Sequence, residues 1–103
     1  MEIGNVIKAL RDKAGFSQKD FAEACSLSAS YLSQIENNTR FPHESTLKEI
    51  AKVLGIPVAI LFFLTIGEED VPEPKREAFQ IIFPSIKSLI TDLFPVTESV
   101  ATD

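Results

Sequence analysis

The amino-acid sequence predicts an all-α protein, a small helical domain followed by an amphipathic helical arm. Residues 17–42 have the pattern of two short helices joined by a tight turn. Between residues 79 and 94, large apolar residues recur at three- and four-residue steps, as in an amphipathic helix. Residues 67–74 combine glycine, acids and two prolines, which is typical of a solvated linker. We therefore expect a domain over residues 1–67, a linker over 68–74, a helical arm over 75–95 and a flexible tail over 96–103.

Local signals place the starts of the two short helices. Ser17, with Asp20 three residues later, has the pattern of a capping box, and Phe16 and Phe21 flank it at the spacing of a hydrophobic staple. Ser28 is suited to cap the second helix, because its hydroxyl can accept a hydrogen bond from a first-turn N–H group. The sequence therefore predicts one helix after Ser17 and another after Ser28.

The second helix has a polar face without charges. Leu32 and Ile35 are expected to face inward, and Asn37 and Asn38 suit the left-handed conformation that ends a helix. Side chains of this size and polarity suit the major groove of DNA, where base edges present donors and acceptors. The residues on or near this outward face are Ala29, Ser30, Ser33, Gln34 and Asn37.

These residues carry a resemblance to a known family. The segment resembles the phage-repressor class (Cro/CI, or XRE) of helix-turn-helix DNA-binding domains. The matching marks are Gln18, Ala22, residues 31–36 (Tyr-Leu-Ser-Gln-Ile-Glu) and Pro42. The resemblance covers roughly residues 3–66. It implies a five-helix lambda-repressor-like domain, with a helix from about 45 to 54 and a last helix led by Pro57.

The resemblance also implies which residues meet DNA. Gln34 can present a bidentate amide to adenine, and Arg40 is the best cation for a phosphate in the loop that follows. Gln18 lies at a helix N-terminus, which favours a phosphate, and in this family such a glutamine also braces the recognition helix. The expected DNA-binding residues are Gln18, Ser28, Ala29, Ser30, Tyr31, Ser33, Gln34, Asn37, Asn38, Thr39 and Arg40.

Two further features follow from the family pattern. Similar domains pair an arginine of the first helix with a glutamate of the recognition helix, which here implies a structural ion pair between Arg11 and Glu36. Ser26 stands where the family often has glycine, so we expect a positive φ there. No arginine or lysine lies between residues 28 and 37, so guanine reading by arginine is absent from that helix. We expect a half-site that leans towards A·T pairs, with part of the selectivity from DNA shape.

The arm needs a surface to cover its apolar stripe. Two arrangements fit the sequence: self-association across a two-fold axis, or folding back on the domain near Ile60 and Phe63. Pro84 interrupts the stripe and should either kink one helix or divide two. The expected dimerisation residues are Phe79, Ile82, Phe83, Ile86, Leu89, Ile90, Leu93 and Phe94.

Charge is distributed unevenly along the chain. The net charge is −5, and all of the excess lies beyond residue 67, because residues 1–67 hold seven basic and seven acidic side chains. A neutral domain can bind DNA if its cations share one face, but the electrostatic contribution is then modest. This favours a dimer, which doubles the phosphate contacts.

Other classes of function find little support in the sequence. The only cysteine, Cys25, lies on an apolar stripe and fits a core residue in a reducing cytoplasm. The longest apolar run, residues 56–66, is too short to span a bilayer. His43 is a lone loop histidine, and no Cys/His cluster has metal-ligand spacing. We expect no enzyme activity, no cofactor and no bound metal.

The sequence thus favours a cytoplasmic, sequence-specific DNA-binding transcriptional regulator, a homodimeric repressor of a near-palindromic operator in double-stranded DNA. Two alternatives stay open. One is an antitoxin-like protein whose C-terminal helix binds a protein partner. The other is an interaction module that kept the fold and lost DNA binding.

Overall fold

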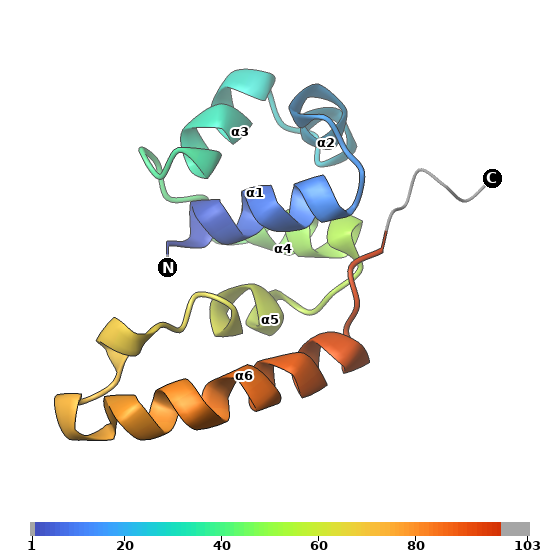
Figure 1. The fold of residues 1–103 in the computed structure, drawn as a ribbon. Helices are drawn as coiled ribbons and strands as arrows, with labels where there is room; N and C mark the ends of the chain where they lie inside the picture. The colour runs from blue at the N-terminus through green and yellow to red at the C-terminus, as the bar shows by residue number, and fades with distance from the viewer. Residues whose placement is uncertain (1, 98–103) are drawn as a thin grey trace.

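The computed structural model describes residues 2–97, and this part of the chain is all-helical (Figure 1). The expected five-helix domain and helical arm are confirmed. The helices are α1 (Ile3–Lys13), α2 (Gln18–Ala24), α3 (Ala29–Glu36), α4 (Glu44–Leu54), α5 (Val58–Phe63) and α6 (Arg76–Leu93), with two short 3₁₀ helices, η1 (Glu68–Asp70) and η2 (Glu73–Lys75), before α6.

The starts of α2 and α3 lie where the capping residues predict. The Ser17 hydroxyl accepts a hydrogen bond from the Asp20 N–H at 3.0 Å, and the Ser28 hydroxyl accepts one from the Tyr31 N–H at 3.0 Å. Phe16 and Phe21 form the expected hydrophobic staple, with ring centroids 5.3 Å apart. Between the two helices, Ser26 has the predicted positive φ, 60°.

The core lies where α1 to α5 meet. Each of these helices contributes a fully buried side chain, such as Ile7, Phe21, Leu32, Ile50 and Leu61. Burying a side chain of this size contributes about 1.5–3 kcal/mol. Figure 1 shows α2 and α3 on one side of α1, and α5 and α6 on the other. The recognition motif therefore rests on a packed platform and leaves its outer side open.

The linker between α5 and α6 is more ordered than a solvated segment. Its residues are largely exposed, but the chain turns twice, at η1 and η2. The Gly67 N–H donates to Asp70 Oδ2 at 2.8 Å, and Arg76 Nε donates to the Val71 carbonyl at 2.9 Å. These turns reverse the chain, so that α6 lies beside α5 (Figure 1).

Helix α6 divides its apolar stripe between two sides. Pro84 lies inside one continuous helix, so the alternative of two separate helices is excluded. Phe83 packs on Phe63 of α5 at 5.4 Å between ring centroids, and Phe79 stacks on Phe83 at 4.6 Å. The arm thus folds back on its own domain through part of its stripe. Much of the rest of the stripe faces outward. Its exposed members are Ile82, Ile86, Leu89 and Leu93, with Phe94 directly after the helix, whereas Ile90 is half-buried.

The segment after α6 returns to the domain. Val96 is buried and belongs to the core cluster, so the expected flexible tail over 96–103 is wrong at its first residue. An apolar valine beside the core gains by leaving water, which outweighs the cost of ordering the short connection. Residues 98–103 lie outside the described part of the chain. None of the described helices combines the length and apolar character needed to cross a membrane.

Candidate nucleic-acid interface

The outer face of α3 is exposed and uncharged. Ser28, Ala29, Ser30 and Gln34 are exposed there, and Tyr31 and Ser33 are half-buried. The only ionised side chain of α3 is Glu36, and it is buried on the opposite face. Helix α3 therefore presents hydroxyl and amide groups, and their ability to donate or accept does not change with pH near neutrality.

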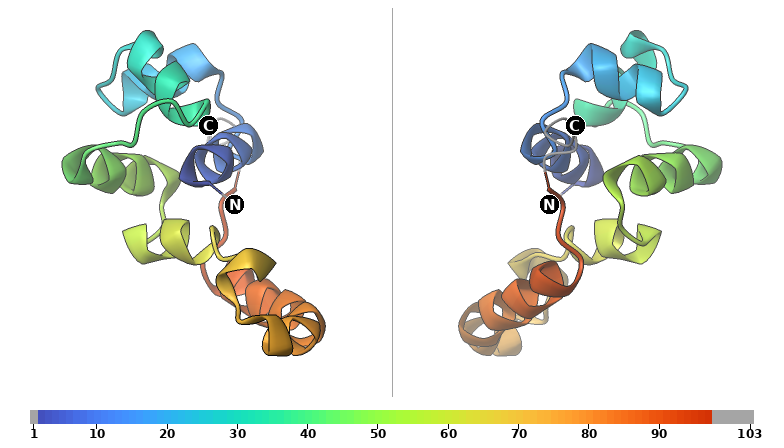
Figure 2. Two further views of the ribbon diagram at one scale, coloured as in Figure 1. Left: turned by 90° about the vertical axis from the view of Figure 1, so that its left-hand side faces the viewer. Right: turned by 90° about the vertical axis from the view of Figure 1, so that its right-hand side faces the viewer.

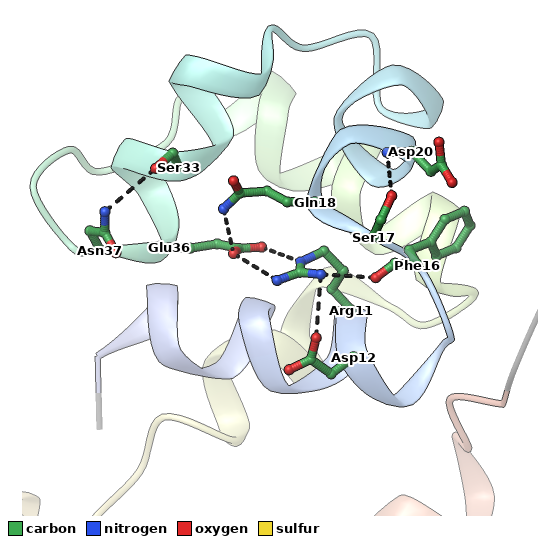
Figure 3. A network of polar contacts seen from close by, with 9 residues as sticks. All are labelled: Arg11, Asp12, Phe16, Ser17, Gln18, Asp20, Ser33, Glu36 and Asn37. Atoms are coloured by element: carbon green, nitrogen blue, oxygen red, sulfur yellow. Dashed lines mark hydrogen bonds and ion pairs between the residues drawn. The ribbon is translucent and has the colours of Figure 1, made fainter.

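A buried ion pair holds α3 in place from behind. Arg11 Nε donates to Glu36 Oε2 at 2.7 Å and Arg11 Nη2 donates to Glu36 Oε1 at 3.2 Å (Figure 3). The same guanidinium donates through Nη1 to the Phe16 carbonyl at 2.8 Å. The hydrogen bond with Glu36 raises the pKa of Arg11 above its ordinary value, against the opposing effect of burial. The expected pair is present, and its bidentate geometry fixes the direction of both side chains.

Gln18 joins the same carboxylate. Its Nε2 donates to Glu36 Oε1 at 3.1 Å, and Figure 3 shows the side chain reaching from α2 towards α3. Glu36 thus ties together the first helix, the start of α2 and the end of α3. This hydrogen bond supports the bracing role implied for Gln18. The contact of Gln18 with a phosphate stays a prediction.

The loop after α3 is clamped to the start of α1 through Asn38. This residue has a positive φ of 62°, as the sequence predicts, whereas Asn37 has a φ of −86°. The Asn38 side chain accepts a hydrogen bond from the Gly4 N–H at 2.9 Å and donates one to Asn5 Oδ1 at 2.8 Å. A Cβ atom on Gly4 would collide with the Ile35 carbonyl and with the Asn38 amide. Glycine is therefore required where the loop crosses α1.

These contacts give Asn38 a structural role beside the DNA contact expected of it, and that DNA contact stays a prediction. Its amide oxygen and nitrogen are both used within the protein, so it acts as a brace for the loop. Gly4 and Asn5 were not singled out from the sequence. The only feature of the sequence that could have indicated this contact is Gly4 itself, because a glycine in the first turn of a helix costs more backbone entropy than an alanine.

The remaining loop residues lie on the exposed side of this clamp. The Thr39 hydroxyl donates to the Gln34 carbonyl at 3.1 Å, and Asn37 Nδ2 donates to the Ser33 hydroxyl at 3.5 Å. The Arg40 guanidinium lies over the Tyr31 ring at 5.1 Å, a cation–π contact that holds the cation beside α3.

The structure thus brings the expected interface residues onto one side of the domain, around α3 and the loop to α4. The views in Figure 2 place α6 at the far end of the molecule from α2 and α3. Cys25, by contrast, belongs to the core, and burial raises the pKa of its thiol to about 12, which keeps it protonated and unreactive. Across residues 2–97, no three His, Cys, Asp or Glu side chains gather as metal ligands.

This fold and interface define a helix-turn-helix domain of the phage-repressor type. A family model described as Helix-turn-helix matches residues 7–61, more than half of the chain. The chain belongs to this family.

Two curated relatives show how far the similarity extends. The chain is 41% identical over 79 residues to the immunity repressor protein of Bacillus phage phi105, across 77% of this chain and 52% of the repressor. It is 31% identical over 96 residues to the HTH-type transcriptional regulator SutR of Escherichia coli strain K12, across 90% of this chain and 48% of SutR. The chain therefore spans about half the length of each of these proteins.

Solved structures of SinR are similar in fold. SinR, described as the master regulator for biofilm formation, in complex with DNA matches 58% of this chain and 97% of that chain at a TM-score of 0.56 and 36% identity. The complex of SinR with SinI matches 84% of this chain and 80% of that chain at a TM-score of 0.59 and 29% identity. The second match reaches well beyond the helix-turn-helix domain.

We expect Glu36→Ala to lower the free energy of unfolding by about 3–5 kcal/mol, because it removes the buried bidentate partner of Arg11 and leaves the guanidinium only the exposed Asp12 carboxylate at 3.3 Å and the Phe16 carbonyl. Urea denaturation followed by circular dichroism measures this. The matched control is Glu44→Ala, which breaks the exposed Glu44–Lys48 pair (3.7 Å) on α4 and should cost less than about 1 kcal/mol. Equal effects of the two substitutions would show that Glu36 has no special structural role.

We expect Asn38→Ala to cost about 2 kcal/mol of stability, because it removes two hydrogen bonds and places a Cβ-bearing residue at a positive φ without local support. Asn38→Gly should recover the part due to the backbone conformation, and Asn37→Ala should be close to neutral. Thermal melts of the three variants measure the order. If Asn38→Ala and the wild type have the same melting temperature, the contact of Asn38 with Gly4 contributes nothing to stability.

Proposed function

We propose that this chain is a sequence-specific DNA-binding transcriptional regulator that represses as a homodimer on a near-palindromic operator. The observation that carries the proposal is the exposed, uncharged face of α3, fixed from behind by Glu36. The family to which the chain belongs, and the similarity to a phage immunity repressor and to SinR in complex with DNA, support the same function. Repression would be steric, through an operator that overlaps a promoter.

The proposed division of labour separates base reading from phosphate binding. Gln34 is the exposed amide in the second half of α3, and a bidentate amide recognises adenine in the major groove. Arg40 lies at the edge of α3 on the Tyr31 ring, where a cation can meet the phosphate backbone. Ser28, Ser30 and Ser33 would add hydrogen bonds of lower specificity. Because no cation lies on α3 itself, the preferred half-site is rich in A·T pairs.

A dimer follows from the small number of cations and from α6. Two recognition helices must enter successive major grooves about 34 Å apart, and this requires a fixed link between two copies. We define the outer ridge as Ile82, Ile86, Leu89 and Leu93, whose side chains are exposed along α6. Since α6 lies at the far end of the molecule from α3 (Figure 1), pairing through the outer ridge leaves the DNA face free.

One observation favours a second function for the same helix. The SinR–SinI complex is a complex with another protein, and its similarity extends over 84% of this chain, into the arm. The outer ridge would then bind a protein partner in place of a second copy. In that case the partner would compete with dimerisation and release the operator.

We expect selection from a random duplex library to enrich a two-fold symmetric motif. On that operator, Gln34→Ala should cost about 1–3 kcal/mol through one base position, whereas Arg40→Ala should weaken all sequences similarly and lower the salt slope by about 1. Binding titrations on operator and scrambled DNA at several salt concentrations separate the two effects. An unchanged ratio of operator to scrambled affinity for Gln34→Ala would rule it out as the base reader.

We expect the double substitution Leu89→Asp with Leu93→Asp to give a folded monomer, because charges on the outer ridge oppose its burial. Operator affinity should fall by roughly 10²-fold or more, the order of gain that linking two binding modules provides. Light scattering and binding titration measure the two effects. Ile81→Asp, at a side chain 73% exposed on another side of α6, is the control and should stay dimeric.

A further inference from the structure

We infer that two copies of α6 pair antiparallel, in a single register in which Leu89 and Leu93 of one chain fill a hollow at the start of α6 in the other. This inference rests on the homodimer of the proposed function and specifies its geometry. It is carried by the shape of α6, which has a hollow at one end of its outer side and two projecting leucines at the other.

The hollow has a volume of about 250 Å³ and an almost wholly apolar lining. Its lining includes Phe79, Ile82, Phe83 and Ile86, which are spaced i, i+3, i+4 and i+7. Four side chains at this spacing surround one hole of knobs-into-holes packing between helices. Phe79 and Phe83 form the side of this hole nearest the domain, because they stack on each other and Phe83 also packs on Phe63.

A second hole adjoins the first. Lys75, Ala78, Phe79 and Ile82 line the same hollow with the same spacing, four residues nearer the start of the helix. The hollow therefore offers two successive holes whose centres are four residues apart. At a rise of 1.5 Å per residue, this separation is about 6 Å along the helix.

The other end of the outer ridge carries two matching knobs. Leu89 is 65% exposed and Leu93 is 71% exposed. They too are four residues apart, so both can enter the two holes of an antiparallel partner at once. Leu89 enters the hole that Ile86 helps to line, and Leu93 enters the hole next to Lys75. Because each chain offers both the hollow and the knobs, the contact is self-complementary, as a two-fold interface requires.

This register places Ile86 close to the two-fold axis, opposite its own copy. It also brings Asp92 of one chain within about one helical turn of Lys75 of the other, so opposite charges meet at each rim. A parallel pair would instead place Lys75 beside Lys75 and Asp92 beside Asp92. It would also set leucine against leucine and leave the hollow empty. Shape and charge therefore favour the antiparallel arrangement and a second copy of this chain as the occupant.

Thiol cross-linking of the full chain tests the register. Ile86→Cys and Leu93→Cys each add one exposed thiol, and the native Cys25 is buried in every variant. We expect a short bis-maleimide with a reach of about 8 Å, the spacing of packed helix axes, to join Ile86→Cys chains into covalent dimers. In the same register the two Leu93 positions lie about 21 Å apart along the axis, so Leu93→Cys should give at least about tenfold less product. A mixture of Leu89→Cys and Ile82→Cys chains should cross-link to each other.

The controls distinguish this inference from the dimer itself. Wild type and Ile81→Cys should remain uncross-linked, and light scattering on each variant reports whether the chain is dimeric. A dimer in which Leu93→Cys cross-links and Ile86→Cys does not overturns the antiparallel register, while the proposed function stands. A chain that is monomeric both free and on selected operator DNA overturns the register together with the homodimer, and leaves the ridge to a protein partner.

Discussion

The carboxylate of Glu36 is the interaction on which the rest of the domain depends. It receives the Arg11 guanidinium of α1 and the Gln18 amide of α2, and it belongs to α3 itself. A buried pair of this kind contributes little net stability, because desolvation offsets most of the attraction, but its hydrogen bonds require defined directions. Its effect is to fix where α3 lies, so that a face of neutral side chains keeps a constant position relative to α1 and α2.

The loop after α3 is fixed by a separate device. Asn38 closes on the first turn of α1, where Gly4 leaves room for the Ile35 carbonyl. The end of α3 and the loop that follows it are therefore both attached to α1, one through an ion pair and one through an amide. Helix α3 lies directly before these attachments and Arg40 lies two residues after them, so both are positioned relative to α1 by contacts at residues 36 and 38. A helix that recognises base edges must be held in a fixed orientation, because hydrogen bonds to bases depend on direction.

The sequence predicted most of the domain because its signals are local or lie within one motif. Ser17 and Ser28 cap helices within three residues, and the positive φ values of Ser26 and Asn38 follow from the turns that they occupy. The Asn38 clamp was missed because it joins residues 34 positions apart. The burial of Val96, and the division of α6 into an inner and an outer side, depend on where Phe63 and the core lie in space. A helical period alone shows one stripe and cannot show which half of it faces the domain. The base and phosphate contacts stay predictions.

The uncharged outer face of α3 affects how molecules of such a protein would distribute between the operator and non-specific DNA sites. Non-specific affinity for DNA comes almost entirely from phosphate neutralisation, and a reader helix without cations, on a domain with no net charge, provides little of it. The millions of irrelevant sites on a chromosome then sequester few molecules. A small number of copies per cell would suffice to keep an operator occupied, and occupancy would respond quickly when dimers are lost.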